Sequence, residues 1–308
     1  MRASSIKSWG LAIALGVISL ALSFAKPNFL TVPNLINVMR QISINGILAV
    51  GVTYVLLTGG VDLSLGSLVA VSGVVAATLA HPNQHSLALP VMLGVMTGAA
   101  CGAVNGLVVT RGKVAPFIAT LGMMTVARGL ALVISGGRPV SNLSGEFTRL
   151  GGDVAGVPIP VIVLAVIAFL SIVFLKNLRL GRYIYAVGGN ENAARASGIS
   201  VAAVKMFAYS ACGAMAGVAG VVLAARITTG QPNAGVGYEL DAIAAVVIGG
   251  TSLSGGVGGI GGTILGALLI GVINNGLDLL NVTSYYQAIV KGVIIVGAVW
   301  LDRRQKLY

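Results

Sequence analysis

Residues 158–175 read PIPVIVLAVIAFLSIVFL, eighteen consecutive positions without a charged side chain. A helix needs about 20 predominantly apolar residues to cross the hydrocarbon core of a bilayer. The whole chain has this character, since 56% of its 308 residues are hydrophobic. Only 9% are charged, against roughly 25% in a soluble domain. These proportions exclude a soluble enzyme, a disordered chain and a nucleic-acid-binding domain.

Ten apolar runs predict an all-α, polytopic membrane helical bundle that occupies residues 1–308 as one transmembrane domain. The runs are 9–25, 40–58, 61–80, 86–109, 114–136, 158–175, 202–226, 239–252, 258–281 and 284–301. The run 239–252 is too short to cross, so we expect a partial or re-entrant helix covered by other protein. Counts of eight or nine crossings stay open. We interpret the first run as an uncleaved helix, because it is longer than a usual signal-peptide core.

The basic residues predict the orientation of the bundle. With the N-terminus inside, twelve fall in inner segments: Arg2, Lys7, Arg111, Lys113, Lys176, Arg179, Arg182, Arg195, Lys205, Arg303, Arg304 and Lys306. Five fall in outer segments: Lys26, Arg40, Arg138, Arg149 and Arg226. Cytoplasmic loops carry an excess of Lys and Arg, so both termini are expected in the cytoplasm. The net charge of +11 therefore reports membrane orientation and predicts no nucleic-acid partner.

The outer loop 137–157 is one of two connections long enough to serve a partner. It contains Arg138, Glu146, Arg149 and Asp153, and it is punctuated by Gly and Pro. Two interpretations stay open, a docking surface for a soluble partner and a solvated connector.

The second long connection, 176–203, reads KNLRLGRYIYAVGGNENAARASGISVAA and is the most polar stretch of the chain. Two glycines break the chain, and Asn190 is then a favourable N-cap for a short helix through Ala196. Glu191 lies in its first turn, where the helix dipole favours an acid, and Gly198 ends it. A capped helix outside the membrane is typical of a contact that fits a groove on a cytoplasmic partner. The residues assigned to this contact are Gly188, Gly189, Asn190, Glu191, Asn192, Ala193, Arg195 and Gly198.

Five stretches, in order along nearly the whole chain, resemble the ribose-type ABC sugar permeases. They are AVGVTYVLLTGGVDLSLGS (49–67), KVAPFIATLGMM (113–124), GRYIYAVGGNENAARASGIS (181–200), GYELDAIAAVVIGGTSLSGG (237–256) and NNGLDLLNVTSYYQAIVKG (274–292). The resemblance implies a type-II-like importer permease of about ten helices in the bacterial inner membrane. It implies a second permease copy or a sibling chain, a cytoplasmic ATPase that binds ATP and Mg, and a periplasmic sugar-binding protein. The loop 176–203 would then couple to the ATPase, and this chain itself would hold no cofactor.

A short pattern, GGxxLS, occurs in both halves of the chain, at residues 59–64 and 249–254. Paired glycine-interrupted segments in two halves of a transporter can mark the pathway. Six residues leave open whether the halves arose by duplication.

Ionisable residues inside apolar runs are costly in a membrane, so a functional role is their default interpretation. They are Asp62, Arg128, Glu239, Asp241, Asp278 and Lys291. We expect Asp62 to cap a helix that begins at Leu63, near the inner interface. Glu239 and Asp241 are expected to cap a short helix, and Arg128 to snorkel outward or to find an acid. Asp278 and Lys291 could form a buried ion pair in the last hairpin.

A pathway for a neutral sugar needs hydroxyl and amide partners. The candidates are Asn45, Thr53, Asn105, Phe117, Thr120, Asn274 and Asn275. For the buried amides, hydrogen bonding between helices is the competing interpretation, and for Phe117 it is packing.

Motifs for chemistry within the chain are missing from the sequence. No GxxxxGK[ST] pattern is present, and His81 and His85 without a neighbouring ligand predict no metal site. We therefore expect a translocation subunit without catalytic residues. An ion-coupled secondary transporter for a small polar solute, using Asp62 or Asp278, is the alternative, and a membrane-embedded enzyme is the third class.

Overall fold

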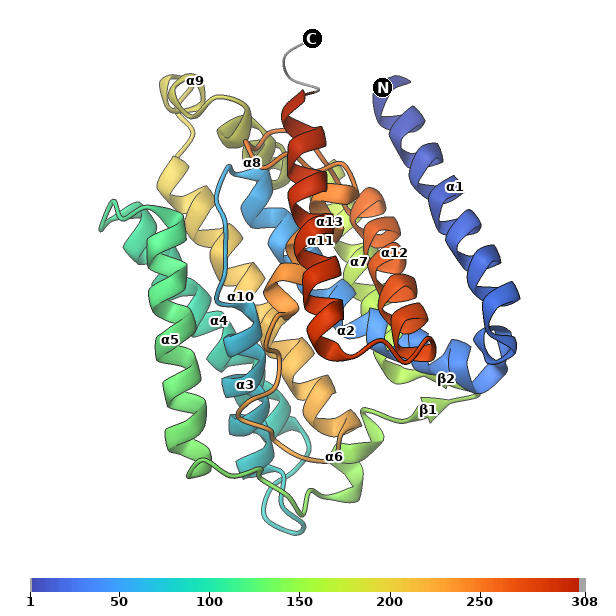
Figure 1. The fold of residues 1–308 in the computed structure, drawn as a ribbon. Coiled ribbons are helices and arrows are strands. Elements are labelled where there is room, and N and C mark those ends of the chain that lie inside the picture. Colours follow the sequence, from blue (N-terminus) through green and yellow to red (C-terminus); the bar gives the residue numbers. More distant parts are fainter. Residues whose placement is uncertain (1, 305–308) are drawn as a thin grey trace.

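The computed structural model describes residues 2–304, and in them the chain is a bundle of helices (Figure 1). The first half contains α1 (Arg2–Ala25), η1 (Pro27–Leu30), α2 (Val32–Leu57), α3 (Leu65–Leu79), α4 (Ala88–Thr110) and α5 (Pro116–Ser135). The outer connection contains α6 (Gly145–Arg149), β1 (Asp153–Val154) and β2 (Val157–Pro158). The second half contains α7 (Ile159–Asn177), α8 (Arg179–Gly189), α9 (Glu191–Ala196), α10 (Val201–Arg226), α11 (Tyr238–Ile248), α12 (Ile260–Leu279) and α13 (Ser284–Arg304).

Six helices of the described chain are long and apolar enough to cross a membrane, namely α2, α4, α5, α7, α10 and α12. Together with the shorter apolar helices, they support a multi-pass membrane bundle. Ten crossings and cytoplasmic termini remain predictions. Lys306, counted among the inner basic residues, lies outside the described residues.

The expected span 61–80 is wrong at its start. Residues 60–64 are not helical, and α3 begins only at Leu65 and has 15 residues. At 1.5 Å per residue, α3 rises about 22 Å, which is less than the hydrocarbon core. The partial helix expected near 239–252 is confirmed as α11, with 11 residues.

Each of these two short helices follows a long helix and a non-helical segment. Helix α2 leads through residues 58–64 into α3, and α10 leads through residues 227–237 into α11. Figure 1 shows α2 running toward the end where α9 lies, and α10 running away from it. The two short helices begin beside each other. Gly66, in the first turn of α3, packs against the backbone of Gly235, which lies just before α11. This inverted arrangement is not the one suggested by GGxxLS, since that pattern precedes α3 but follows α11.

Glycines allow the close packing of α4 on α10. Gly94, Gly98, Gly102 and Gly106 recur every fourth residue of α4, so they lie on one helix face. A methyl group added at Gly98 would overlap the backbone of Gly213, which belongs to α10. Small residues let helix backbones approach in a membrane, where no hydrophobic effect drives association.

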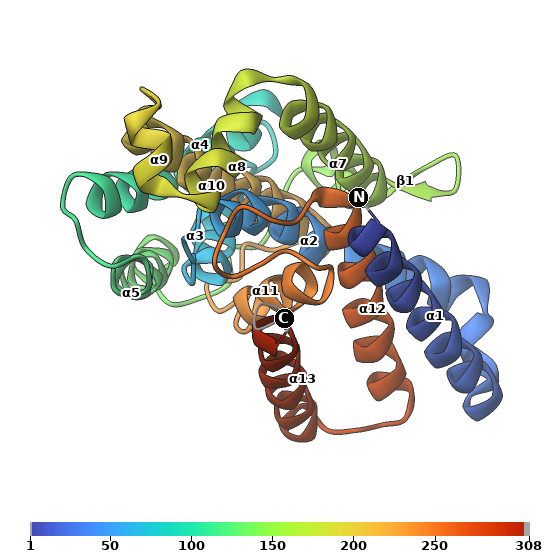
Figure 2. The ribbon, with the colours of Figure 1, turned by 90° about the horizontal axis from the view of Figure 1, so that it is seen from above.

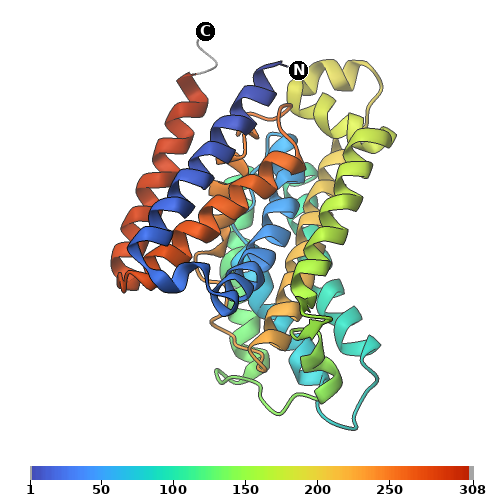
Figure 3. The same cartoon turned by 90° about the vertical axis from the view of Figure 1, so that its right-hand side faces the viewer.

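Both described chain ends lie at the same end of the bundle as α9 (Figures 1 and 3). Viewed from that end, α1, α12 and α13 stand on one side, and α4, α5 and α9 on the other (Figure 2).

The loop 137–157 lies at the opposite end from α9. Its helix α6 is capped by Ser144, whose Oγ accepts from the amide of Phe147 at 3.3 Å, and Asp153 pairs with Arg40. The partner role expected of this loop remains a prediction.

Candidate functional site

The short helix α9 is built as the sequence predicts. Oδ1 of Asn190 accepts a hydrogen bond from the Ala193 amide at 3.0 Å, which satisfies one of the free donors at the helix start. At the other end, the amides of Gly198 and Ile199 donate to the carbonyls of Arg195 and Ala194. With Gly198 at φ +80°, these two bonds form a Schellman cap. Helix α9 is therefore fixed by its own sequence at both ends.

A charged tether joins α9 to α10. Oε2 of Glu191 accepts from Nζ of Lys205 at 2.6 Å, and Oε1 accepts from Arg195 at 3.0 Å. Hydrogen bonding from Lys205 lowers the pKa of Glu191 below its ordinary value, with Arg195 contributing less. Glu191 and Arg195 lie four residues apart on one helix face, so the sequence alone predicts their ion pair. The contact with Lys205 depends on how the chain turns after α9.

Helix α8, which the sequence did not predict, carries this loop back onto the bundle. Gly188 lies so close to α2 that an added methyl group would overlap the carbonyl oxygen of Leu57. The amide of Gly256 donates to that carbonyl at 3.0 Å. Nearby, Gly255 packs against the backbones of Gly188 and Gly59. The end of α8 thus touches the breaks that follow both α2 and α11.

Arg128 fixes the non-helical segment that precedes α11 by hydrogen bonds to its backbone. Nη1 of Arg128, on α5, donates to the carbonyl oxygens of Pro232 and Ala234 at 2.6 and 2.8 Å. Arg128 therefore bonds backbone carbonyls instead of snorkelling outward, and the expectation that it finds an acid is met by an electrostatic interaction with Glu239 on α11. Backbone carbonyls without a helical partner need donors inside a bundle, and this guanidinium supplies them.

Asp62 caps the helix break differently from the expectation. It lies fully buried just before α3, and its position near the inner interface remains a prediction. Its Oδ1 accepts from the amide of Ser64 at 2.9 Å and from the Ser64 hydroxyl at 2.6 Å. Asn105, on α4, donates to the same hydroxyl at 3.0 Å. Asp62 therefore organises the break through a neighbouring serine.

Lys291 pairs with Asp241, so the expected pair of Lys291 with Asp278 is wrong. Nζ of Lys291, on α13, lies 2.8 Å from Oδ2 of Asp241 on α11. Asn274, on α12, donates to the same oxygen at 3.3 Å. Asp278 is exposed and accepts from Gln287. One buried carboxylate thus joins three helices.

The comparisons with known proteins agree with this architecture. The sequence profile of the family described as "Branched-chain amino acid transport system / permease component" matches residues 34–299. The chain belongs to this family.

Three relatives extend the similarity over nearly the whole permease. The "Ribose import permease protein RbsC" of Escherichia coli K12 is 49% identical over 96% of this chain and 93% of its own length. The "D-allose transport system permease protein AlsC" of the same organism is 41% identical over 91% and 86%. The "L-arabinose ABC transporter permease protein AraH" of Azospirillum brasilense is 38% identical over 96% and 88%. No solved structure matches the permease.

Most predicted pathway residues of the permease bond to their own or neighbouring helices. Thr53 and Thr263 hydroxyls lie 2.8 Å apart and join α2 to α12. Asn275 and Asn34 exchange two hydrogen bonds of 2.9 and 3.0 Å. Thr120 bonds within α5. Asn45 is buried in α2, whereas Phe117 is 58% exposed on α5. Their contact with a sugar remains a prediction.

The sequence did not reveal the partners of several groups that organise the permease. Asp241 bonds Lys291 and Lys205 bonds Glu191, and Tyr185, which the sequence did not single out, donates to the Gly258 carbonyl at 3.0 Å. No local pattern marks such contacts. The cost of burying Asp241 and Lys291 indicates only that each needs a partner.

Proposed function

We propose that this permease is the membrane-spanning subunit of an ATP-binding-cassette importer that moves ribose or a related monosaccharide into the cytoplasm. The observation that carries the proposal is the 49% identity with a ribose import permease, which extends over 96% of the chain. Identity falls to 41% and 38% for the allose and arabinose relatives, which favours ribose.

The proposed complex sits in the bacterial inner membrane, with both termini of the permease in the cytoplasm. A second permease copy or a sibling chain completes the pore. A periplasmic binding protein delivers the sugar, and a cytoplasmic ATPase holds ATP and Mg. The single domain 1–308 then needs no cofactor of its own and contacts membrane lipid around its apolar faces.

We assign the coupling to α9 and α8 acting together. Nucleotide-driven closure of the ATPase displaces α9, which Glu191 ties to α10. Helix α8 passes the displacement to the point where Gly255 packs against Gly188 and Gly59. Gly59 belongs to the non-helical segment after α2, and Gly255 to the one after α11. Packed elements with two discrete arrangements can carry such coupling. The short helices α3 and α11 would then move against each other at the centre of the bundle, where the sugar passes.

Reconstitution tests the proposal. The permease, its ATPase and its binding protein are placed in proteoliposomes, and uptake of radiolabelled ribose is measured with ATP supplied on the ATPase side. We expect uptake that requires ATP and the binding protein. Uptake driven by a proton or sodium gradient in vesicles without ATPase would instead support a secondary transporter.

A panel of pentoses and hexoses tests the sugar assignment. The purified binding protein is titrated calorimetrically with ribose, allose, arabinose and xylose. Tightest binding of ribose is expected, and preference for another sugar would overturn the choice of ribose while leaving the transporter class intact.

A further inference from the structure

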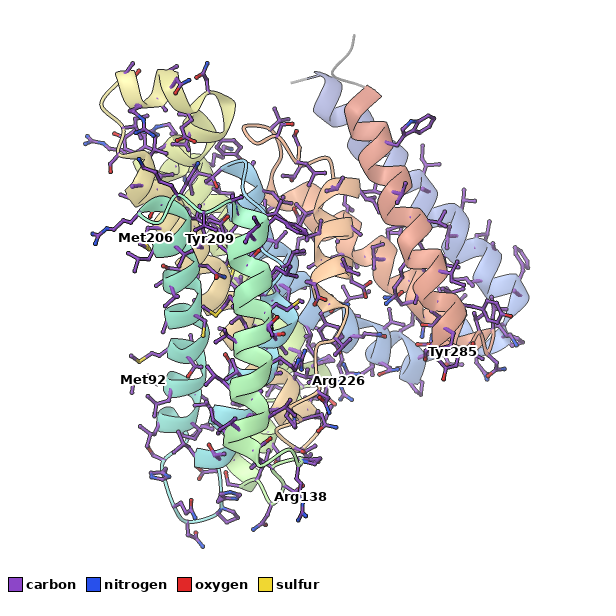
Figure 4. The ribbon with its side chains drawn as sticks, turned by 60° about the vertical axis from the view of Figure 1, so that its left-hand side comes forward. Met92, Arg138, Met206, Tyr209, Arg226 and Tyr285 are labelled. Carbon is purple, nitrogen blue, oxygen red and sulfur yellow. The ribbon has the colours of Figure 1, made fainter. Side chains whose placement is uncertain are left out.

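A groove of about 560 Å³ lies between α9, the end of α4 and the start of α10. Its charged lining comes from three elements: Glu191 and Arg195 on α9, Lys205 on α10, and Lys113 in the turn between α4 and α5. Figure 4 shows Met206 on α10 beside the end of α4, close below α9, which places the groove at that end of the bundle.

The groove carries uncompensated positive charge. Both carboxylate oxygens of Glu191 are already taken, by Arg195 and Lys205. In the described part of the chain, no acidic side chain lies within ion-pair distance of Lys113. Three cations therefore face one acid.

The turn that presents Lys113 is held by the backbone. The amide of Val114 donates to the Val108 carbonyl at 3.3 Å, and Lys113 itself has φ +53°. A positive φ is uncommon for a residue other than glycine, so the turn has a defined shape. Arg111 in the same turn is also exposed but does not line the groove.

We propose that this groove receives an acidic side chain of the ATPase subunit, so that the α4–α5 turn forms a second contact with the ATPase beside α9. The inference rests on the proposed function and names a surface that the sequence did not assign. A carboxylate is the occupant that the charge favours, because complementary potentials across an interface guide association and exclude wrong partners. The groove opens beside α9, so one ATPase surface reaches both.

Charge reversal of Lys113 is the first test. The full-length permease is held in nanodiscs of neutral lipid, and its affinity for the purified ATPase subunit is measured by biolayer interferometry. We expect Lys113→Glu to weaken binding about tenfold or more, and Arg111→Glu to weaken it less than about threefold. Because Lys113 makes no ion pair within the described structure, Lys113→Glu should melt at the wild-type temperature. Equal losses for both variants would indicate diffuse attraction and would overturn the assignment.

Carbodiimide cross-linking identifies the occupant directly. The reagent joins a lysine amine to a carboxylate within contact distance, with loss of water. We expect a cross-linked peptide that contains Lys113 and an aspartate or glutamate of the ATPase. Lys113→Arg should keep the affinity and abolish this product. A Lys113 product that contains only permease peptides would contradict the proposal.

Two further measurements separate the possible failures. If simultaneous reversal of Glu191 and Arg195 abolishes ATPase binding while Lys113→Glu does not, the groove assignment fails and the proposed function stands. If wild-type permease does not bind the ATPase at all, the proposed function fails. If Lys113→Glu acts only in nanodiscs containing anionic lipid, the groove holds a lipid headgroup and the ATPase assignment is overturned.

Discussion

Replacing Lys291 by methionine should destabilise the bundle by about 3 kcal/mol. The ammonium lies 2.8 Å from a carboxylate whose side chain is only 5% exposed. At that distance the gross attraction is about 6 kcal/mol for an effective dielectric constant of about 20, before desolvation. Breaking a buried pair by removing one partner costs about 3–5 kcal/mol, because the remaining charge stays buried. We take the lower end because Lys291 is itself 29% exposed.

A double-mutant cycle isolates this interaction. In Lys291→Met, Asp241 loses the ammonium and keeps the hydrogen bond from Asn274. In Asp241→Asn together with Lys291→Met, neither charge remains, so the double variant should lose only about 1 kcal/mol. The expected coupling energy is about 2 kcal/mol or more.

Reversible unfolding of the purified permease in SDS mixed micelles measures these free energies. Asp278→Asn is the matched control, because it removes an acid that is exposed and accepts a hydrogen bond from the neutral side chain of Gln287. It should change stability by less than about 0.5 kcal/mol. A double variant as unstable as Lys291→Met, or a loss for Asp278→Asn that equals it, would refute the reasoning.

Three further predictions concern α8 and α9. Gly188→Ala should abolish transport, because the added methyl group overlaps the backbone of α2. The control Gly189→Ala, whose methyl group meets no atom within 4 Å, should transport normally. Similar transport rates for the two variants would refute the close contact of Gly188 with α2. Asn190→Ala should lower the protection of α9 amides in hydrogen exchange by about 1 kcal/mol, against little change for Asn192→Ala. Because the pKa of Glu191 is lowered, its tether is complete above the ordinary value of about 4.3 and is lost as pH falls through the folded-state value. A spin label on α9 should therefore gain mobility in acid, and Glu191→Gln should remove that pH dependence.

The sequence predicted the elements that depend on short stretches of neighbouring residues, namely the apolar helices and the capped helix α9. The apolar runs predicted the positions of most helices, because a helix that faces lipid must be apolar all along its length. Asn190 and Gly198 placed α9, since caps act within one turn. Helix α8 was missed, because its glycines and arginines suggest a loop until Gly181 and Gly188 pack against α7 and α2.

Partners distant in sequence could not be predicted in the same way. Lys291 and Asp278 lie in one hairpin, which made their pairing plausible, yet Asp241 lies closer in space. Arg128 was expected to find an acid or the membrane surface; besides an electrostatic interaction with Glu239, it bonds carbonyl oxygens freed by an interrupted helix. Each of these outcomes depends on which helix faces which.

The sequence alone determined that this protein is a multi-pass membrane bundle with a capped helix outside its spans. Hydropathy and capping act through solvent and through neighbouring residues, so both can be read along the chain. Tertiary structure alone decided where the buried charges find partners and how α8 reaches both helix breaks. It also brought Lys113 beside α9, because residues about eighty positions apart meet only when α4 packs on α10.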